Sequence, residues 1–147
     1  MFLPTLAELF ERDLLKLREE INLYTEEQTL WSIRGHISNS AGTLCLHLLG
    51  NLNHFVGTVL GQTGYLRDRD AEFASRDIPR NQLIASINET IVMMKNVLGK
   101  LSADDVAGNY PVEKHGQIVT MPYMLLHLLT HLNYHLGQVN YHRRLVG

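Results

Sequence analysis

The residues of this chain best suited to chemistry are its histidines. The sequence has eight, and six of them fall on two otherwise apolar stretches, residues 41–62 and 121–145. In the second stretch His127, His131 and His135 recur at steps of four. Residues four apart on an α-helix lie about 40° apart around its axis and one turn apart along it, so two such imidazoles can reach one ion. This spacing is therefore a chelating geometry.

The first stretch carries a matching polar stripe, formed by His47, Asn51 and His54. Polar groups on an apolar helix must be satisfied internally, because burying them unpaired costs several kcal/mol. A single buried histidine is more often a hydrogen-bonded core residue than a ligand. Three or four imidazoles that converge between two helices can all bind one cation through their lone pairs. If they instead hydrogen-bond to one another, some N–H donors face each other without an acceptor. The spacing predicts a metal site that draws on both stripes, with His47 and His54 both open as ligands.

The types of ligand residue limit which metal ion the site can bind. Imidazole favours zinc, nickel, copper or iron(II) over magnesium or calcium. Cys45 is the only cysteine, which excludes both an intrachain disulfide and a zinc site built from several thiolates. Three protein ligands would leave coordination positions open for water or a substrate, as a catalytic site requires.

Four helices are needed to position these residues. Apolar periodicity predicts a helix over residues 4–24, a second over 41–62, a third from Pro79 along a heptad stripe to Leu101, and a fourth over 121–145. We expect the charged segment 67–73 to be an ordered connection rather than a helix, and residues 103–120 to form a loose, β-like hairpin. The predicted fold is all-α, a four-helix bundle of one domain, 1–147, whose long connections permit crossovers.

Composition excludes several classes of partner and enzyme. Thirteen Lys and Arg against fifteen Asp and Glu give a net charge of −2, so we expect no nucleic acid and no anionic membrane as partner. No apolar run reaches the ~20 residues of a membrane span and the N-terminus lacks a basic leader, so we expect a cytoplasmic protein. Glu-x-x-His, His-Glu-x-x-His and Gly-x-Ser-x-Gly motifs are absent, which argues against di-iron, zincin and serine-hydrolase chemistry.

Three stretches of the chain resemble the DinB-like family of metalloenzymes. Residues 39–51, Asn-Ser-Ala-Gly-Thr-Leu-Cys-Leu-His-Leu-Leu-Gly-Asn, are similar to its second-helix segment. Residues 67–73, Arg-Asp-Arg-Asp-Ala-Glu-Phe, are similar to the loop that follows it, and residues 131–138 match its His-x-x-x-His-x-Gly-Gln motif. With the matching order of helices, the similarity spans almost the whole chain.

The resemblance implies a ligand set and a range of activities. In the family one histidine of the second helix and both histidines of the motif bind the metal, which maps onto His47, His131 and His135 and favours His47 over His54. The expected ion is divalent, zinc or nickel. Some relatives are thiol S-transferases that use bacillithiol or mycothiol, and others are proposed hydrolases. Members are commonly homodimers, which fits the apolar surface of the second predicted helix, so we expect a homodimer here.

Two functions follow as hypotheses. The first is a metal-dependent enzyme, a thiol transferase or hydrolase, in which the ion activates water or thiol toward an unidentified small-molecule substrate such as a low-molecular-weight thiol. The second is a non-catalytic bundle, whose ion ties two helices together or which serves dimerisation. No general base stands out beside the histidines, which weakens the first hypothesis, although a metal-bound hydroxide needs none.

Other polar residues are candidates for supporting roles. His127 is either a fourth ligand or a hydrogen-bonded partner of the site, and Asn51 and His54 are expected to line it. Gln138 is a candidate to orient a ligand histidine by a hydrogen bond. Arg67 and Arg69 are candidates for a gate that recognises an anionic substrate, with a surface ion-pair network as the alternative. The remaining histidines are expected to be solvated: His36, His115 and His142.

Overall fold

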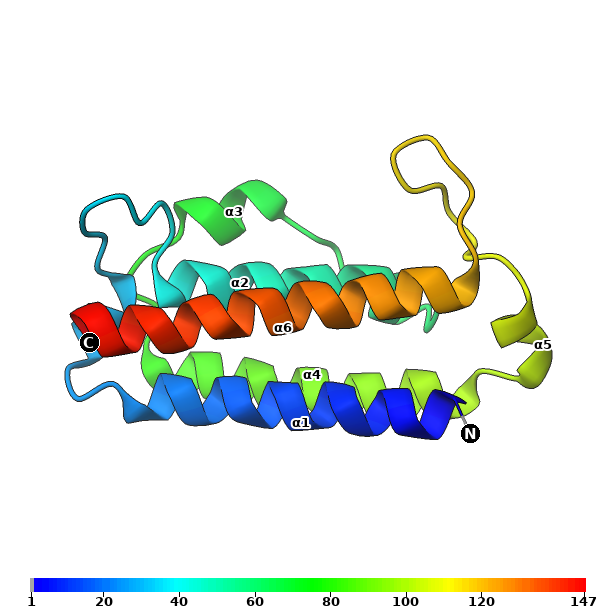
Figure 1. The fold of residues 1–147 in the computed structure, drawn as a ribbon, viewed down its shortest axis with the longest axis horizontal. Helices are drawn as coiled ribbons and strands as arrows, with labels where there is room; N and C mark the ends of the chain where they lie inside the picture. The colour runs from blue at the N-terminus through cyan, green and yellow to red at the C-terminus, as the bar shows by residue number, and fades with distance from the viewer. Residues whose placement is uncertain (1) are drawn as a thin grey trace.

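The computed structural model describes residues 2–147 and is almost entirely helical. Its elements are α1 (Phe2–Leu23), η1 (Glu27–Trp31), α2 (Ala41–Leu52), η2 (Asn53–Thr58), α3 (Arg69–Ala74), α4 (Arg80–Lys100), α5 (Ala103–Ala107) and α6 (Met121–Val146). The long helices α1, α2, α4 and α6 form the bundle (Figure 1). The predicted all-α class is confirmed. Over the same residues, no helix is long and apolar enough to cross a membrane.

The bundle contains a crossover. α1 and α6 run in one direction and α2 and α4 in the other, and the segment that carries α3 passes over the bundle between α2 and α4 (Figure 1). α1 packs mainly on α4 and α6, and α2 packs on the same two helices. α2 and α6 are therefore antiparallel neighbours, which places the two histidine stripes of the sequence on adjacent helices.

The sequence explains where these helices begin. Thr120 accepts a hydrogen bond from the backbone N–H of Tyr123, and Pro122 stands in the first turn of α6. Ser40 caps α2 in the same way through the N–H of Thr43. Along α1 and α4 the apolar stripes face inward, with Phe10, Leu14 and Ile87 inaccessible to solvent.

Two connecting segments differ from the sequence prediction. The segment 67–73, expected to be non-helical, contains the short helix α3, because Asp68 caps it through the N–H of Ala71 and acidic residues occupy its first turn. Residues 103–107, assigned to the hairpin, form α5 instead, because Ser102 and Asp105 make a reciprocal capping box. The rest of the expected hairpin is a loop held by the isolated bridges Asn109–Thr120 and Lys114–Gln117.

The second predicted helix changes character at its centre. α2 ends at Leu52, and residues Asn53–Thr58 continue as a turn of π-helix, so the α-helical register predicted through Gln62 is wrong beyond that point. The apolar surface of α2, which was consistent with a homodimer, is covered within the chain by α3, α4, α6 and η1. It therefore gives no support to a dimer, and the oligomeric state stays a prediction.

Candidate metal centre

Three histidines from two helices converge at the middle of the bundle. His47 projects from α2, and His131 and His135 project from consecutive turns of α6. Each offers one ligand atom, and these atoms all lie within 4.8 Å of one another. The Nε2 atoms of His47 and His131 are 3.2 Å apart, and the His131 and His135 ring centroids are 4.6 Å apart. The structure thus brings together the three residues that the resemblance selected.

Hydrogen bonds outside the cluster fix the tautomers of two of these imidazoles. Two groups approach His47 Nδ1, Glu72 Oε1 at 3.1 Å and Arg67 Nη2 at 3.5 Å. Because a carboxylate only accepts, the shorter contact to Glu72 is a hydrogen bond when Nδ1 carries the proton. Gln138 Oε1 lies 2.6 Å from His135 Nδ1 and has the same effect. In both His47 and His135, Nε2 is therefore unprotonated and has a free lone pair. This tautomer follows from the hydrogen-bond partners.

The third imidazole shows that a cation fits the cluster. If His131 donated its Nε2 proton to His47, that proton would satisfy only one of the two Nε2 lone pairs that His47 and His135 present, and His131 Nδ1 has no hydrogen-bond partner among the described residues. Such an arrangement leaves His131 satisfied on one side only. A cation accepts a lone pair from all three rings at once, so the donor set of this site fits a divalent transition metal.

Burial favours the neutral form of two of the imidazoles in the cluster, His131 and His47. Desolvation, helped by the neighbouring His135 and His47, lowers the pKa of His131 to about 4. Desolvation also lowers the pKa of His47, although the hydrogen bond and charge of Glu72 oppose the shift. Neutral imidazole is the form that binds metal, so no proton has to be displaced from these two rings at pH 7.

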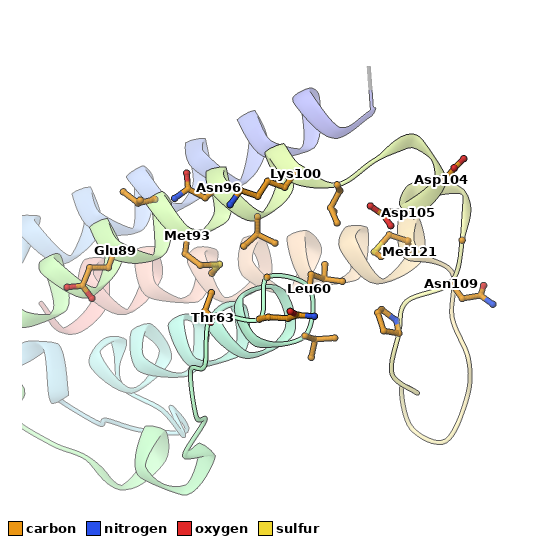
Figure 2. Close-up of a pocket in the computed structure, with 18 residues that line it drawn as sticks. Leu60, Thr63, Glu89, Met93, Asn96, Lys100, Asp104, Asp105, Asn109 and Met121 are labelled. Atoms are coloured by element: carbon orange, nitrogen blue, oxygen red, sulfur yellow. The ribbon is translucent and has the colours of Figure 1, made fainter.

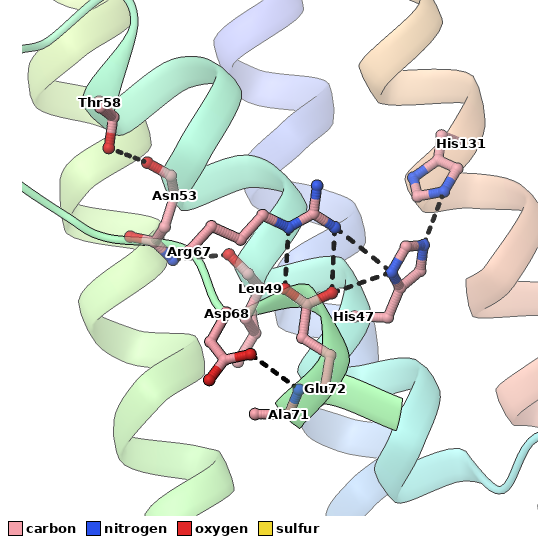
Figure 3. Close-up of polar contacts among 9 residues, drawn as sticks. All are labelled: His47, Leu49, Asn53, Thr58, Arg67, Asp68, Ala71, Glu72 and His131. Atoms are coloured by element: carbon pink, nitrogen blue, oxygen red, sulfur yellow. Dashed lines mark hydrogen bonds and ion pairs between the residues drawn. The ribbon is translucent and has the colours of Figure 1, made fainter. Parts of the chain in front are cut away.

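α3 supplies a carboxylate, Glu72, that lies against the cluster. Glu72 is buried, accepts from His47, and is held by Arg67 through two contacts, Nε–Oε2 of 2.8 Å and Nη2–Oε1 of 3.0 Å (Figure 3). Gly50 permits this approach, because a Cβ there would lie 1.9 Å from Glu72 Oε2. Glu72 is 25 positions from His47 and lies within a charged run. Nothing in the sequence therefore indicates that it is buried against the His47 ring.

The two arginines proposed as a gate lie in different settings. Arg67 is mostly buried in its ion pair with Glu72. Arg69 is exposed, and its guanidinium carbon lies 5.0 Å from the centre of the Phe73 ring. Phe73 in turn packs on the His47 ring, with centroids 5.0 Å apart. The structure thus connects both arginines to His47, and their role toward a substrate stays a prediction.

The other candidate residues lie outside the ligand cluster. His54, on the π-helical turn, packs its ring on Phe55 at 4.7 Å between centroids. The ring of His127 is parallel to that of Tyr123 at 6.3 Å, one turn before His131. Asn51 is buried one turn beyond His47, and its Oδ1 has no partner among the described residues.

One histidine was misassigned to solvent. His142 is 3% exposed, its Nδ1 lies 2.6 Å from Tyr24 Oη, and its Nε2 lies 2.8 Å from the carbonyl oxygen of Ser32. Since the carbonyl only accepts, Nε2 carries the proton and the tyrosine donates to Nδ1. Its position near the chain end suggested exposure, but the segment after α1 folds back and covers it. His36 and His115 are exposed as expected.

Two cavities of the bundle differ in their relation to the histidine cluster. A cleft of about 520 Å³ is lined by His135 and Gln138 together with the segment 36–39 and the last turns of α6. A larger cavity of about 950 Å³ lies at the far end of the bundle, where Glu89, Lys100, Asp104 and Asp105 line it (Figure 2). It contains no histidine. The smaller cleft is therefore the one relevant to chemistry at the cluster.

The fold and the site together define a helical bundle with a candidate three-histidine metal centre. The sequence model of the family described as "Protein of unknown function (DUF1572)" matches residues 2–147, and the chain belongs to that family, which is DinB-like. No curated protein and no solved structure matched the chain. The resemblance to the DinB-like family is thereby confirmed, whereas the family description itself gives no activity.

Proposed function

We propose that this protein is a metal-dependent enzyme that binds one divalent transition ion, zinc or nickel, through Nε2 of His47, His131 and His135. The observation that carries the proposal is the convergence of three imidazoles whose ligand atoms lie within 4.8 Å of one another. Two of the three rings are already held with Nε2 unprotonated by oxygens outside the cluster. When bound, such an ion supplies Lewis acidity that lowers the pKa of a coordinated water or thiol.

The residues of the chain have separable roles in this proposal. Glu72 holds the His47 ring in orientation and makes its Nε2 more basic, and Gln138 does the same for His135 with an uncharged oxygen. Arg67 balances the charge of Glu72 within the protein. Three protein ligands leave room for a water or a substrate atom, which supports thiol transfer or hydrolysis as the class of reaction.

A non-catalytic bundle is the second candidate. It is favoured by the origin of the ligands, since an ion held by α2 and α6 would tie together two helices that are far apart in the sequence. In that case the coordination sphere would be closed by protein or by an inert water.

Cobalt substitution distinguishes the two candidates. The full chain would be loaded with Co²⁺, and its visible spectrum would be followed while pH is varied and while a small thiol is added. The enzyme proposal predicts a spectral change with an apparent pKa near neutrality and a thiolate charge-transfer band. A spectrum insensitive to both would contradict an open coordination position and favour the non-catalytic bundle.

A further inference from the structure

Two polar atoms on the facing stripes of α2 and α6 are buried without a partner. Among the buried side-chain nitrogens and oxygens of the described residues, those that lack a hydrogen bond belong to Asn51, His131 and Arg80. Arg80 begins α4, and its other guanidinium nitrogens donate to the backbone carbonyls of Asn22 and Tyr24. Asn51 Oδ1 and His131 Nδ1 are therefore the unpartnered atoms that belong to the two polar stripes.

The packing of the two helices places these residues on adjacent turns. The Nε2 atoms of His47 and His131 are 3.2 Å apart, and α2 and α6 are antiparallel neighbours. The turn of α2 that follows His47 and carries Asn51 therefore lies beside the turn of α6 that precedes His131. Side chains of an α-helix lean toward the N-terminus of their own helix. In an antiparallel pair this makes Asn51 and His131 lean toward each other.

Metal binding makes these two atoms chemically complementary. A neutral imidazole that gives its Nε2 lone pair to an ion carries its proton on Nδ1, so a metal-bound His131 presents a buried N–H donor. The amide oxygen of Asn51 only accepts, and the residue is 8% exposed. A buried donor and a buried acceptor that both lack partners cost stability, and a hydrogen bond between them removes that cost.

We propose that Asn51 is the positioning residue of the third ligand, whose Oδ1 accepts the Nδ1 proton of metal-bound His131 directly or through one water molecule. The inference deepens the proposed function and rests on it for the metal. Each of the three ligand imidazoles then has an oxygen on its outer nitrogen, from Glu72, Gln138 and Asn51. It also explains a buried amide where a leucine of similar shape would leave no acceptor unpaired.

NMR of the imidazole ring tests this contact. The full chain, with isotope-labelled histidine, would be titrated with Zn²⁺, and two-bond proton–nitrogen spectra would show which nitrogen of His131 carries the proton. We expect an Nδ1 proton that is shifted downfield and exchanges slowly with water once zinc is bound. In Asn51→Leu it should exchange faster, and the dissociation constant for Zn²⁺ should rise about tenfold. In Asn51→Asp the anionic acceptor should keep the proton protected and shift it further downfield.

Thermal unfolding without metal separates positioning from packing. Leucine has nearly the shape of asparagine and carries no acceptor, so Asn51→Leu should leave the melting temperature of the metal-free chain unchanged or raise it. Asn53→Leu is the matched control, because the Asn53 amide donates to the carbonyl oxygen of Leu49 and to Thr90 Oγ1. This control should lower the melting temperature and leave the ring signals of His131 unchanged.

The outcomes distinguish the inference from the proposed function. If zinc binds and the His131 Nδ1 proton keeps its shift and exchange rate in Asn51→Leu, another group accepts that proton, and the inference is overturned while the metal site stands. A lower melting temperature of metal-free Asn51→Leu with unchanged zinc affinity would also overturn it, since Asn51 would then be a packing residue. If Zn²⁺ leaves the imidazole resonances of the native chain unmoved, the proposed function fails and the inference fails with it.

Discussion

The three imidazoles of the cluster differ in what holds their outer nitrogen. His47 has a carboxylate, His135 has an amide oxygen, and His131 Nδ1 has no partner among the residues that the structure describes. An outer hydrogen bond to an anion raises the basicity of a ligand imidazole more than one to an amide. His47 is therefore expected to be the strongest donor, and Glu72 the most sensitive position outside the ligands.

Glu72→Gln should weaken Zn²⁺ binding about 10–100-fold, because the amide keeps a hydrogen bond to His47 but loses its negative charge. Glu20→Gln is the matched control, since Glu20 is equally buried and paired with Arg143 but lies away from the cluster. Competition with a chromophoric chelator gives both affinities, and thermal unfolding corrects for lost stability. Equal affinity losses in the two variants would show that the effect is one of folding rather than of His47.

His142→Gln should remove part of the acid sensitivity of folding. Burial lowers the pKa of His142 in the folded state below its ordinary value of 6.5, so the unfolded chain binds the proton more readily. The stability that neutral His142 contributes is therefore present above pH 6.5 and is lost as pH falls through the folded-state pKa. Glutamine can accept from Tyr24 and donate to Ser32 without titrating.

Urea unfolding of native chain and variant, in the same metal-free buffer, measures this difference. We expect the free energies of unfolding to differ by a constant amount above pH 6.5 and to converge below it. Curves that stay parallel down to pH 5 would contradict the assignment.

At the scale of elements, the long helices could be predicted from the sequence and the short ones could not. Strict apolar periodicity specified α1, α4 and α6, and Thr120 also caps α6. α3 and α5 are too short to show a period, and their capping residues lie within charged runs that also suit a loop. The π-helical turn has no sequence pattern of its own, so the α-helical spacing that puts His47 and His54 on one stripe does not apply beyond Leu52.

Some residues of the candidate site could likewise be predicted from the sequence, and others could not. His131 and His135 follow from helix periodicity alone, and a partner on the second stripe follows from chemistry. His47 was separated from His54 only by the family resemblance. Glu72 could not be predicted, because its role depends on how the crossover segment folds onto α2, a long-range contact that residues 67–73 do not encode locally.

Gly50→Ala tests whether the packing of α3 on α2 positions the site. A Cβ at this position would lie 1.9 Å from Glu72 Oε2, so α3 or the carboxylate must move. We expect a loss of stability of about 1–3 kcal/mol and weaker Zn²⁺ binding. Gly99→Ala is the control, because nothing lies within 4 Å of its added Cβ and alanine favours a helix. Hydrogen exchange over residues 69–74 should accelerate only in Gly50→Ala.

At the scale of the whole molecule, different helices of the bundle supply the core and the candidate metal ligands. α1 and α4 supply core, whereas α2 and α6 carry the ligands and α3 packs on α2 (Figure 1). An ion bound here would join two helices whose ligands are 84 residues apart in the chain. Its binding energy therefore contributes to the stability of the fold.

Chelation should lower the melting temperature of the protein. Free Zn²⁺ at 100 times its dissociation constant adds about 2.7 kcal/mol to a folded state that alone binds it. For a domain of this size the expected rise is roughly 5–10 °C, reversed by a chelator. Calorimetry of the native chain and of His131→Ala measures it. A variant that retains the full zinc-dependent shift would contradict binding at the cluster.

The most direct measurement is the metal content of untagged protein from metal-replete growth, determined by mass spectrometry for the native chain and for His47→Ala, His131→Ala and His135→Ala. His54→Ala serves as the control, because its ring packs on Phe55 rather than in the cluster. The account predicts about one zinc or nickel ion per chain, retained in the control and lost in each of the three variants. A native chain without metal, or a full complement in any of the three, would contradict the three-histidine centre and identify the cluster as a buried polar network.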